Sequence, residues 1–291
     1  MKHSRITIFL ASSILLATGC ASTDGAPTND ANDADLGQST ETSTAHEVAG
    51  LDCEAPFVAV PAPAAEPPFS GTAFVTNDLI TEADPTAFVD LTYAGQASRS
   101  MFDRRTATFI TVDAHLFDAQ FGAEKTVEIQ VNPEFTKAEA ETEARFYAAA
   151  IGRIPAFLFR DLDTVWIHRG MQAFGGGNRN LLIHTEQGQA YVATGSLEEI
   201  FVHEGTHTSL DAYHAAAPRW VEARQADGVA ISTYARDNPA TEDVSESLGP
   251  YLAVRHRADR IPSETADAIR ATMPNRIKYF DCLGLAMDIQ P

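Results

Sequence analysis

Two histidines stand four residues apart in the stretch EIFVHEGTHTSLD, residues 199–211, and a glutamate directly follows the first of them. On a helix, positions i and i+4 lie on one face a turn apart, so His203 and His207 can hold one metal ion together. Glu204 is turned by about 100° from His203 around the axis, because an α-helix has 3.6 residues per turn. Its carboxylate therefore misses the ion but reaches a water bound to it. This spacing predicts zinc-assisted hydrolysis with Glu204 as the general base.

A catalytic zinc site also needs a third protein ligand and an open fourth position. Glu242 and Glu246 are one helical turn apart in the stretch 234–257, YARDNPATEDVSESLGPYLAVRHR, so they project from one face. One carboxylate can bind the ion while the other orients a ligating histidine through its second ring nitrogen. Paired carboxylates also occur on solvated helix faces. Their position downstream of the two histidines favours the metal site.

These residues carry a resemblance to a known family. HEGTHTSLD, residues 203–211, resembles the active-site helix of thermolysin-type gluzincins. The later tyrosine, followed by Glu-x-x-x-Glu, resembles the arrangement in anthrax lethal factor-like gluzincins, and together the two similarities cover roughly residues 164–257. The resemblance implies a zinc metallopeptidase acting on a peptide or protein substrate. It makes His203, His207 and Glu242 the zinc ligands, Glu204 the general base, Glu246 and Asp211 supports of the ligands, and Tyr234 the donor to the oxyanion.

The same resemblance indicates where substrate would lie. In such enzymes a strand edge beside the active-site helix pairs with an extended peptide, and NLLIH at 180–184 stands in the right order along the chain. His184 would then border the site, although a buried, hydrogen-bonded histidine is the alternative interpretation for it and for His168. A later histidine, such as His214 or His256, is an alternative to Tyr234 at the oxyanion.

The elements that must position these residues follow from the hydrophobic pattern. Alternating or continuous apolar runs predict strands, and helical periodicity with start signals predicts helices. We expect strands at 106–112, 125–131, 164–168 and 180–184, and helices at 136–153 behind a Thr136/Glu139 capping box, at 197–214 behind Ser196, at 218–226 from Pro218, and at 263–273.

Two glycine-containing stretches complete the expected elements. The helix carrying Glu242 is expected to begin near Ala240 and to be interrupted or kinked at Gly249-Pro250. The run 175–177 is expected to form a mobile loop, since no Lys-Ser or Lys-Thr follows it as in a phosphate-binding loop. With the resemblance, the elements predict an α+β, zincin-like fold. In it a twisted mixed or antiparallel sheet packs on the HExxH helix, with a helical C-terminal lobe.

The first twenty residues, MKHSRITIFLASSILLATGC, have the pattern of a secretory signal. Two basic residues precede an apolar run from Ile6 to Ala17, which is too short to span a membrane. The stretch ATGC, ending at Cys20, resembles a bacterial lipobox, in which that cysteine is lipidated. We predict a signal peptide at 1–19 and a protein of the cell envelope, attached to a bacterial membrane only through a lipid on Cys20, with secretion as the alternative.

The next stretch is acidic and poor in apolar side chains. It cannot bury enough surface to fold, which predicts a disordered tether at 20–60. The remainder fits one domain at 61–291, with a strand-rich part at 61–135 and a catalytic part at 136–291. The formal net charge of −19 argues against nucleic acid as a partner. With Cys20 lipidated, an oxidising compartment favours a disulfide between Cys53 and Cys282.

Two alternatives to a peptidase are compatible with the sequence. A non-catalytic surface lipoprotein could use the zinc site to hold its fold or to bind a partner. Removal of metal would then unfold the domain, and no peptide would be cleaved. An enzyme acting on peptidoglycan cross-links would differ from a peptidase in substrate only.

Overall fold

The computed structural model describes residues 51–287. The predicted signal peptide at 1–19, the lipidation site Cys20 and most of the predicted tether lie outside these residues. Within 51–287, no helix has the length and apolar character needed to cross a membrane.

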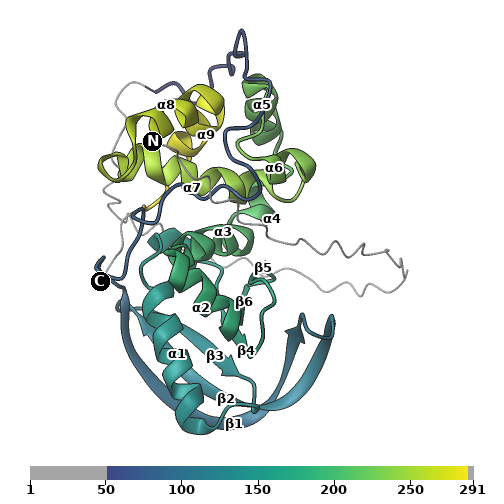
Figure 1. The fold of residues 1–291 in the computed structure, drawn as a ribbon, viewed down its shortest axis with the longest axis vertical. Helices are drawn as coiled ribbons and strands as arrows, with labels where there is room; N and C mark the ends of the chain where they lie inside the picture. The colour runs from purple at the N-terminus through teal and green to yellow at the C-terminus, as the bar shows by residue number, and fades with distance from the viewer. Residues whose placement is uncertain (1–50, 288–291) are drawn as a thin grey trace, which may run out of the picture. The chain divides into compact units, whose positions relative to one another are not determined.

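The described chain has a mixed α+β fold with one six-stranded sheet (Figure 1). The strands are β1 (Phe88–Asp103), β2 (Thr108–Phe121), β3 (Lys125–Val131), β4 (Thr164–His168), β5 (Gly175–Gly177) and β6 (Asn180–His184). Their order in the sheet is β1-β2-β3-β4-β6-β5. The sheet is mixed, because β3, β4 and β6 run parallel whereas the remaining neighbours are antiparallel.

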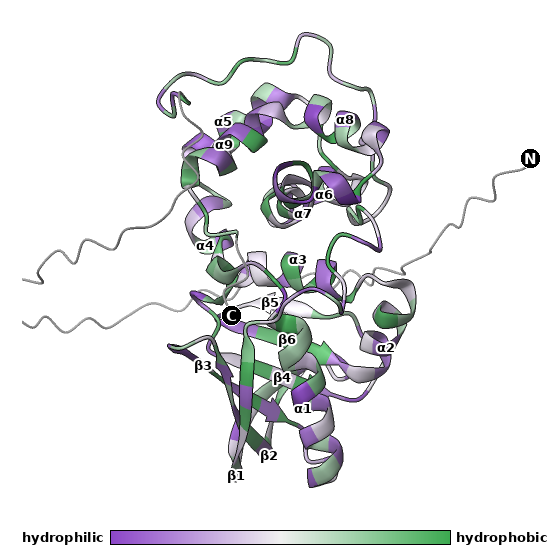
Figure 2. Cartoon of the chain, turned by 90° about the vertical axis from the view of Figure 1, so that its left-hand side faces the viewer, coloured by the Kyte–Doolittle hydropathy of each residue, from purple (hydrophilic) through white to green (hydrophobic). Residues whose placement is uncertain are grey.

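The described chain also contains nine α-helices. They are α1 (Lys137–Ile151), α2 (Thr185–Thr194), α3 (Leu197–Ser209), α4 (Asp211–His214), α5 (Pro218–Asp227), α6 (Thr233–Asp237), α7 (Asp243–His256), α8 (Ser263–Thr272) and α9 (Pro274–Leu283), with short 3-10 turns at Ala156–Phe159 and Ala258–Arg260. In the views of Figures 1 and 2, α3 lies between the sheet and the group formed by α5 to α9. The helix with the HExxH stretch is therefore packed on both sides.

The main core forms where one face of the sheet meets α1 and α3. Val127, Ile129 and Val165 from the sheet share a buried cluster with Tyr147 of α1 and Phe201 of α3. The predicted strands 125–131, 164–168 and 180–184 are confirmed as β3, β4 and β6. The prediction at 106–112 covers only the start of β2, and β1 was not predicted.

Local signals explain several helix boundaries. Thr136 and Glu139 form the predicted capping box at the start of α1, which satisfies backbone N–H groups left free at a helix N-terminus. Pro218 begins α5 as expected. Ser196 stands at the start of α3, but its hydroxyl does not cap the helix and instead bonds to the Thr194 hydroxyl at 2.8 Å.

Three expectations about helices and loops were wrong. The run Gly175–Gly177 is an edge strand, β5, and not a loop. Helix α7 continues through Pro250, so the expected interruption was wrong, whereas a kink there stays a prediction; most residues of the helix are buried, and tertiary packing outweighs the lost backbone bond. The HExxH helix ends at Ser209 and not at His214, since the carbonyl of Ser209 accepts from Arg160 at 2.7 Å and leaves the helical hydrogen-bond ladder.

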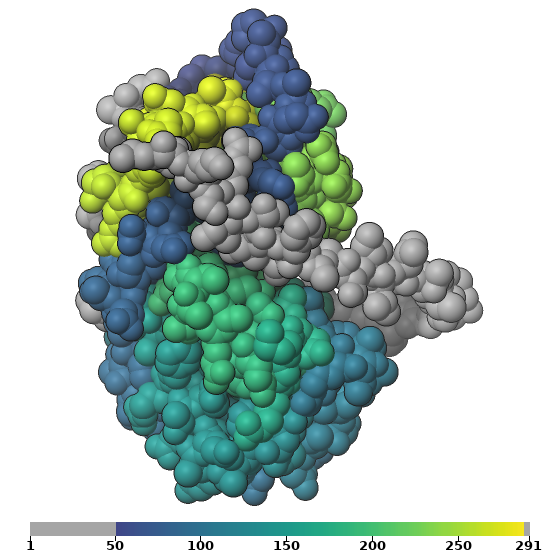
Figure 3. Space-filling view, in the orientation of Figure 1, coloured from purple at the N-terminus to yellow at the C-terminus, as the bar shows by residue number. Residues whose placement is uncertain are grey.

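Residues 51–87 run over the helical part before they enter β1, and Figure 3 shows them in dark blue. Cys53 and Cys282 form the predicted disulfide, with Cα atoms 5.6 Å apart. The backbone N–H groups of Val58 and Val60 donate to Asn275 and to Ala226 at 3.0 and 2.8 Å. The folded part therefore begins before residue 61, inside the stretch predicted as a tether.

Candidate metal centre

Helix α3 is held by neighbours around most of its circumference. Leu197, Ile200 and Phe201 are buried in the main core. On another side the hydroxyl of Thr208 donates to the carbonyl of Asn180 in β6 at 2.9 Å. Gly176 of β5 packs so tightly on the helix that an added Cβ would lie 1.9 Å from the carbonyl oxygen of Glu204. These contacts fix the backbone that carries His203, Glu204 and His207.

Glu242 reaches the histidines from the residue just before α7. The next residue, Asp243, is buried and pairs with Arg276 at 2.8 Å, and Arg276 pairs with Asp227 of α5 at the same distance. Arg276 is fully buried, so loss of either carboxylate would leave guanidinium N–H groups in the interior without an acceptor. This network joins α5, α7 and α9 and thereby sets where α7 begins.

Three donor atoms of the predicted ligands converge. The Nε2 atoms of His203 and His207 are 3.2 Å apart, and Oε2 of Glu242 lies 3.5 Å from the first and 3.3 Å from the second. A tetrahedral zinc ion with bonds of about 2.0–2.1 Å would separate its donors by roughly 3.3 Å. The three sides of the triangle match this spacing. Within residues 51–287 this is the one cluster of His, Cys, Asp and Glu residues with such geometry.

Outer carboxylates set the orientation of both imidazoles. Nδ1 of His207 donates to Asp211 at 2.6 Å, and Nδ1 of His203 lies 3.3 Å from Oε1 of Glu246. With each Nδ1 carrying the proton, each Nε2 presents a lone pair to the centre of the triangle. Two lone pairs and a carboxylate oxygen at this spacing repel each other unless positive charge lies between them. The donor set therefore fits a cation.

The pKa shifts of the three proposed ligands also favour positive charge at this site. Burial works against charge on His207, but hydrogen bonds with Asp211 and Glu242 outweigh it and raise its pKa to about 10. Neighbouring carboxylates also raise the pKa of His203, again against the effect of burial. Burial alone would raise the pKa of Glu242, yet the two histidines hold it well below its ordinary value. The surroundings thus stabilise positive charge at the centre.

The side chains expected to act on substrate lie beside this triangle. Burial, the carboxylate of Glu242 and a hydrogen bond to it raise the pKa of Tyr234 to about 12, so its hydroxyl is protonated at neutral pH. The charge of Glu204 contributes to the raised pKa values of Tyr234, His203 and His207. Its carboxylate is therefore near all three groups, although no bond joins it to the triangle.

A backbone segment that the sequence did not reveal supports the site from outside. Residues 69–76 bond along one side of it: the N–H of Ala73 donates to Oε2 of Glu246 at 2.8 Å, and that of Tyr234 donates to the carbonyl of Gly71 at 3.2 Å. The N–H groups of Val75 and Thr76 donate to Glu199 of α3 at 2.9 and 3.1 Å. Because these bonds are made by backbone groups, no pattern of side chains in the sequence predicts them.

Glu199 lies one turn before His203 and gives a pH-dependent prediction. It is buried, no charged group contributes to its ionisation, and burial raises its pKa to about 7 despite the two N–H donors. A carboxyl whose pKa is raised on folding stabilises the fold below its ordinary pKa and loses this contribution as pH rises through the folded value.

Glu199→Gln should therefore gain in melting temperature relative to the wild type between pH 5 and pH 8, by on the order of 5 °C. Glutamine keeps one acceptor for the N–H groups but does not ionise. Thermal unfolding at several pH values measures this, with the exposed Glu264→Gln as the control whose difference stays constant. A pH-independent difference for Glu199→Gln would contradict the assignment.

Among residues 51–287, no other histidine belongs to the metal cluster. His168 and His184 are fully buried at the ends of β4 and β6, with stacked rings, and burial lowers the pKa of His168 to about 4 and that of His184 as well. The Nδ1 of His184 bonds to the carbonyl of Arg169 at 2.9 Å. The buried interpretation of both is correct. His214 bonds to the hydroxyl of Tyr279 at 2.7 Å.

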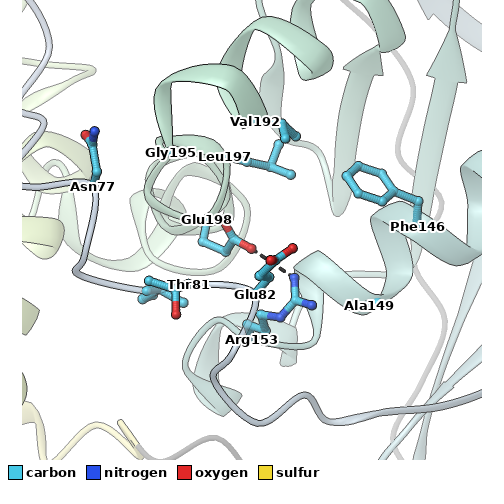
Figure 4. A pocket seen from close by; sticks show the side chains of 11 residues that line it. Asn77, Thr81, Glu82, Phe146, Ala149, Arg153, Val192, Gly195, Leu197 and Glu198 are labelled. Atoms are coloured by element: carbon cyan, nitrogen blue, oxygen red, sulfur yellow. Dashed lines mark hydrogen bonds and ion pairs between the residues drawn. The ribbon is translucent and has the colours of Figure 1, made fainter.

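A separate cavity of about 360 Å³ lies at the other end of α3, and Figure 4 shows the side chains that line it. Arg153, beyond the end of α1, and Glu198, in the first turn of α3, form an ion pair of 2.9 Å in its wall. Phe146 and Val192 also line it, and both are about half exposed. None of the predicted site residues lines this cavity. Its ion pair ties the start of α3 to α1.

Comparison of the chain with known protein families, with curated proteins and with solved structures finds no match. The function is therefore inferred from the residues of the site and their geometry.

Proposed function

We propose that this protein is a zinc-dependent metallopeptidase with a zincin-like active site. The observation that carries the proposal is the convergence of His203, His207 and Glu242 at 3.2 to 3.5 Å beside Glu204. Two imidazoles and one carboxylate form a ligand set used by catalytic zinc, whereas calcium and magnesium favour oxygen ligands alone. When bound there, zinc supplies a Lewis acid for the substrate carbonyl and lowers the pKa of a coordinated water to about 7.

Glu204 and Tyr234 supply the protein's part of the hydrolysis. Glu204 takes a proton from the attacking water and delivers it to the amine nitrogen as the peptide bond breaks. The Tyr234 hydroxyl, protonated at neutral pH, donates a hydrogen bond to the oxyanion that develops on the substrate carbonyl. Asp211 and Glu246 keep the histidines oriented throughout, because each receives or faces an Nδ1.

The open edge of β5 supports peptide as the substrate. Asn178 and Arg179 both have positive φ and form a two-residue turn between Gly177 and Asn180. The N–H of Thr164 in β4 donates to the carbonyl of Arg179, so the N–H and C=O of Leu181 face β4 and its pair with Gly176 is not hydrogen-bonded. Bonded and non-bonded pairs alternate, so the N–H and C=O of Gly176 point away from β6. Within the described chain no strand pairs with that edge. An extended peptide can bond there, directly beside Glu204. The prediction that β6 itself offers this edge was wrong.

Two features favour a catalytic over a structural zinc site. Structural sites are closed by four protein ligands, and only three donors converge among residues 51–287. The side chains of His203, His207 and Glu242 remain 13, 16 and 14% exposed, so the centre is accessible to solvent. The disulfide between Cys53 and Cys282 supports an oxidising location, which agrees with the proposed cell-envelope or secreted protein.

Replacement of Glu242 by glutamine tests the metal centre. Wild-type protein should bind one zinc ion and cleave peptides, lose activity with a chelator and regain it with zinc. Glu242→Gln should weaken zinc binding by about 100-fold or more, because a neutral amide replaces the anionic ligand. Zinc titration and metal analysis measure this, with the exposed Glu222→Gln as control.

The outcomes separate the proposal from its alternative. Unchanged zinc affinity in Glu242→Gln would exclude the proposed ligand set. Zinc binding without cleavage of any peptide, together with unfolding on chelation, would instead support a structural zinc site in a non-catalytic surface lipoprotein.

A further inference from the structure

The first two residues of the edge strand β5 face different surroundings. Successive residues of a strand point to opposite faces of the sheet. On the face toward α3, an added Cβ on Gly176 would meet the backbone of Glu204. On the opposite face, an added Cβ on Gly175 would lie 2.8 Å from Nη2 of Arg104 and 3.5 Å from its Cζ. The guanidinium of Arg104 therefore lies over Gly175 of β5. The next residue, Gly176, is the one through which this strand contacts the catalytic helix.

The tip of the β1–β2 hairpin brings Arg104 to this position. The next residue, Arg105, forms ion pairs with Asp103 at 2.8 Å and with Glu134 at 2.7 Å. These two bonds anchor the tip and occupy Arg105. Arg104 is exposed and has no hydrogen bond or ion pair with any residue between 51 and 287. Arg105 thus anchors the tip of the hairpin, whereas Arg104 makes no bond to a described residue.

An independent electrostatic relation places Arg104 near the site. Burial raises the pKa of Tyr191 in α2 to about 12; the carboxylate of Glu204 adds to this effect and the charge of Arg104 opposes it. The charges of Glu204 and Arg104 therefore both affect the pKa of the Tyr191 hydroxyl. In a chain with 40 acidic and 21 basic side chains, an arginine without an acidic partner is a cation available to a ligand.

We propose that Arg104 determines substrate specificity by binding an acidic side chain of the extended peptide. A residue paired opposite Gly175 directs its side chain to the same face as Arg104, with Cα atoms about 4.5–5.5 Å across the strands. Its neighbour, opposite Gly176, points to the face of Glu204 and the zinc ligands. The site then selects aspartate or glutamate adjacent to the residue that faces the metal. This inference rests on the proposed peptidase function.

Peptide pairs that differ in one charge test the inference. Zinc-loaded protein is assayed with internally quenched peptides that carry aspartate or glutamate, the matching amide, or lysine at each of three positions on either side of the scissile bond. At one of these positions, aspartate or glutamate should raise kcat/KM about five- to tenfold over the matching amide. A charge-assisted hydrogen bond at a solvent-accessible position provides an effect of this size. Arg104→Gln should abolish this ratio, and Arg104→Glu should transfer the preference to lysine.

A control variant, the melting temperatures and two distinct negative outcomes complete the test. Arg145→Gln changes an exposed arginine on α1 that, among the described residues, pairs with Glu141 alone, at 3.8 Å, and it should leave the ratio unchanged. The Arg104 variants should keep the wild-type melting temperature because no described residue bonds to that side chain. Cleavage without an acidic preference, or a preference retained in Arg104→Gln, overturns this inference alone. Absence of zinc-dependent cleavage of every peptide overturns the proposed function and this inference with it.

Discussion

Glu204→Gln is expected to lower kcat/KM for peptide cleavage by about 10²- to 10⁴-fold while the protein keeps its zinc. The substitution preserves the size of the side chain and removes only its ability to accept a proton. Glu204 makes no bond to the His203, His207 and Glu242 triangle, so the ligands and their supporting carboxylates stay in place. Its backbone contact with Gly176 is also unaffected by the exchange.

The comparison with Glu242→Gln makes this result specific. Both variants replace a glutamate by its amide within the same site, but only Glu242 is a proposed ligand. Steady-state kinetics and metal analysis on the two proteins should therefore show lost rate with bound zinc in one and lost zinc in the other. Wild-type activity in Glu204→Gln would rule out its action as general base.

The sequence predicted those parts of the site that depend on short-range geometry. His203 and His207 converge because both stand on one helix at a spacing set by the helical pitch. Asp211 bonds to His207 from just past the break at Leu210, so this prediction did not depend on where the helix ends. The convergence of Glu242 with the histidines was a proposal from spacing and resemblance, and the fold brings these atoms together.

The parts that the sequence did not predict depend on tertiary contacts of the backbone. Residues 69–76 bond to Glu199 and Glu246 through main-chain N–H groups, which every residue except proline carries. Glycine has a low preference for strands, so the run Gly175–Gly177 indicated a loop. The closeness of α3 explains the glycine at 176, and a positive φ explains the one at 177.

Long hairpin strands were also difficult to predict. Strand β1 alternates half-buried with exposed residues over most of its length and contains few large apolar side chains. Its register is set by pairing with β2, which no local pattern in residues 88–103 encodes. For the same reason the placement of Arg104 over β5 could not be predicted, since it depends on the path of the whole hairpin.

Gly176→Ala should be the most damaging single-methyl change in the proposed active site. The added Cβ would lie 1.9, 2.6 and 2.9 Å from the O, C and Cα atoms of Glu204, all of them backbone atoms. No side chain can rotate to make room, so β5 must move away from α3. Overpacking of this kind destabilises by about 1–3 kcal/mol. A displacement of about 1 Å between substrate edge and general base can reduce the rate by about 10²-fold.

Gly249→Ala provides the matched control. Gly249 lies within α7, and an added Cβ there would have no atom within 4 Å. Alanine in a helix interior is favoured over glycine by roughly 0.5–1 kcal/mol, so this variant should retain activity and melt at or above the wild-type temperature. Melting temperature and kcat/KM are measured for both proteins. If Gly176→Ala behaved like the control, β5 would not be packed on Glu204, and the peptide edge would have to lie elsewhere.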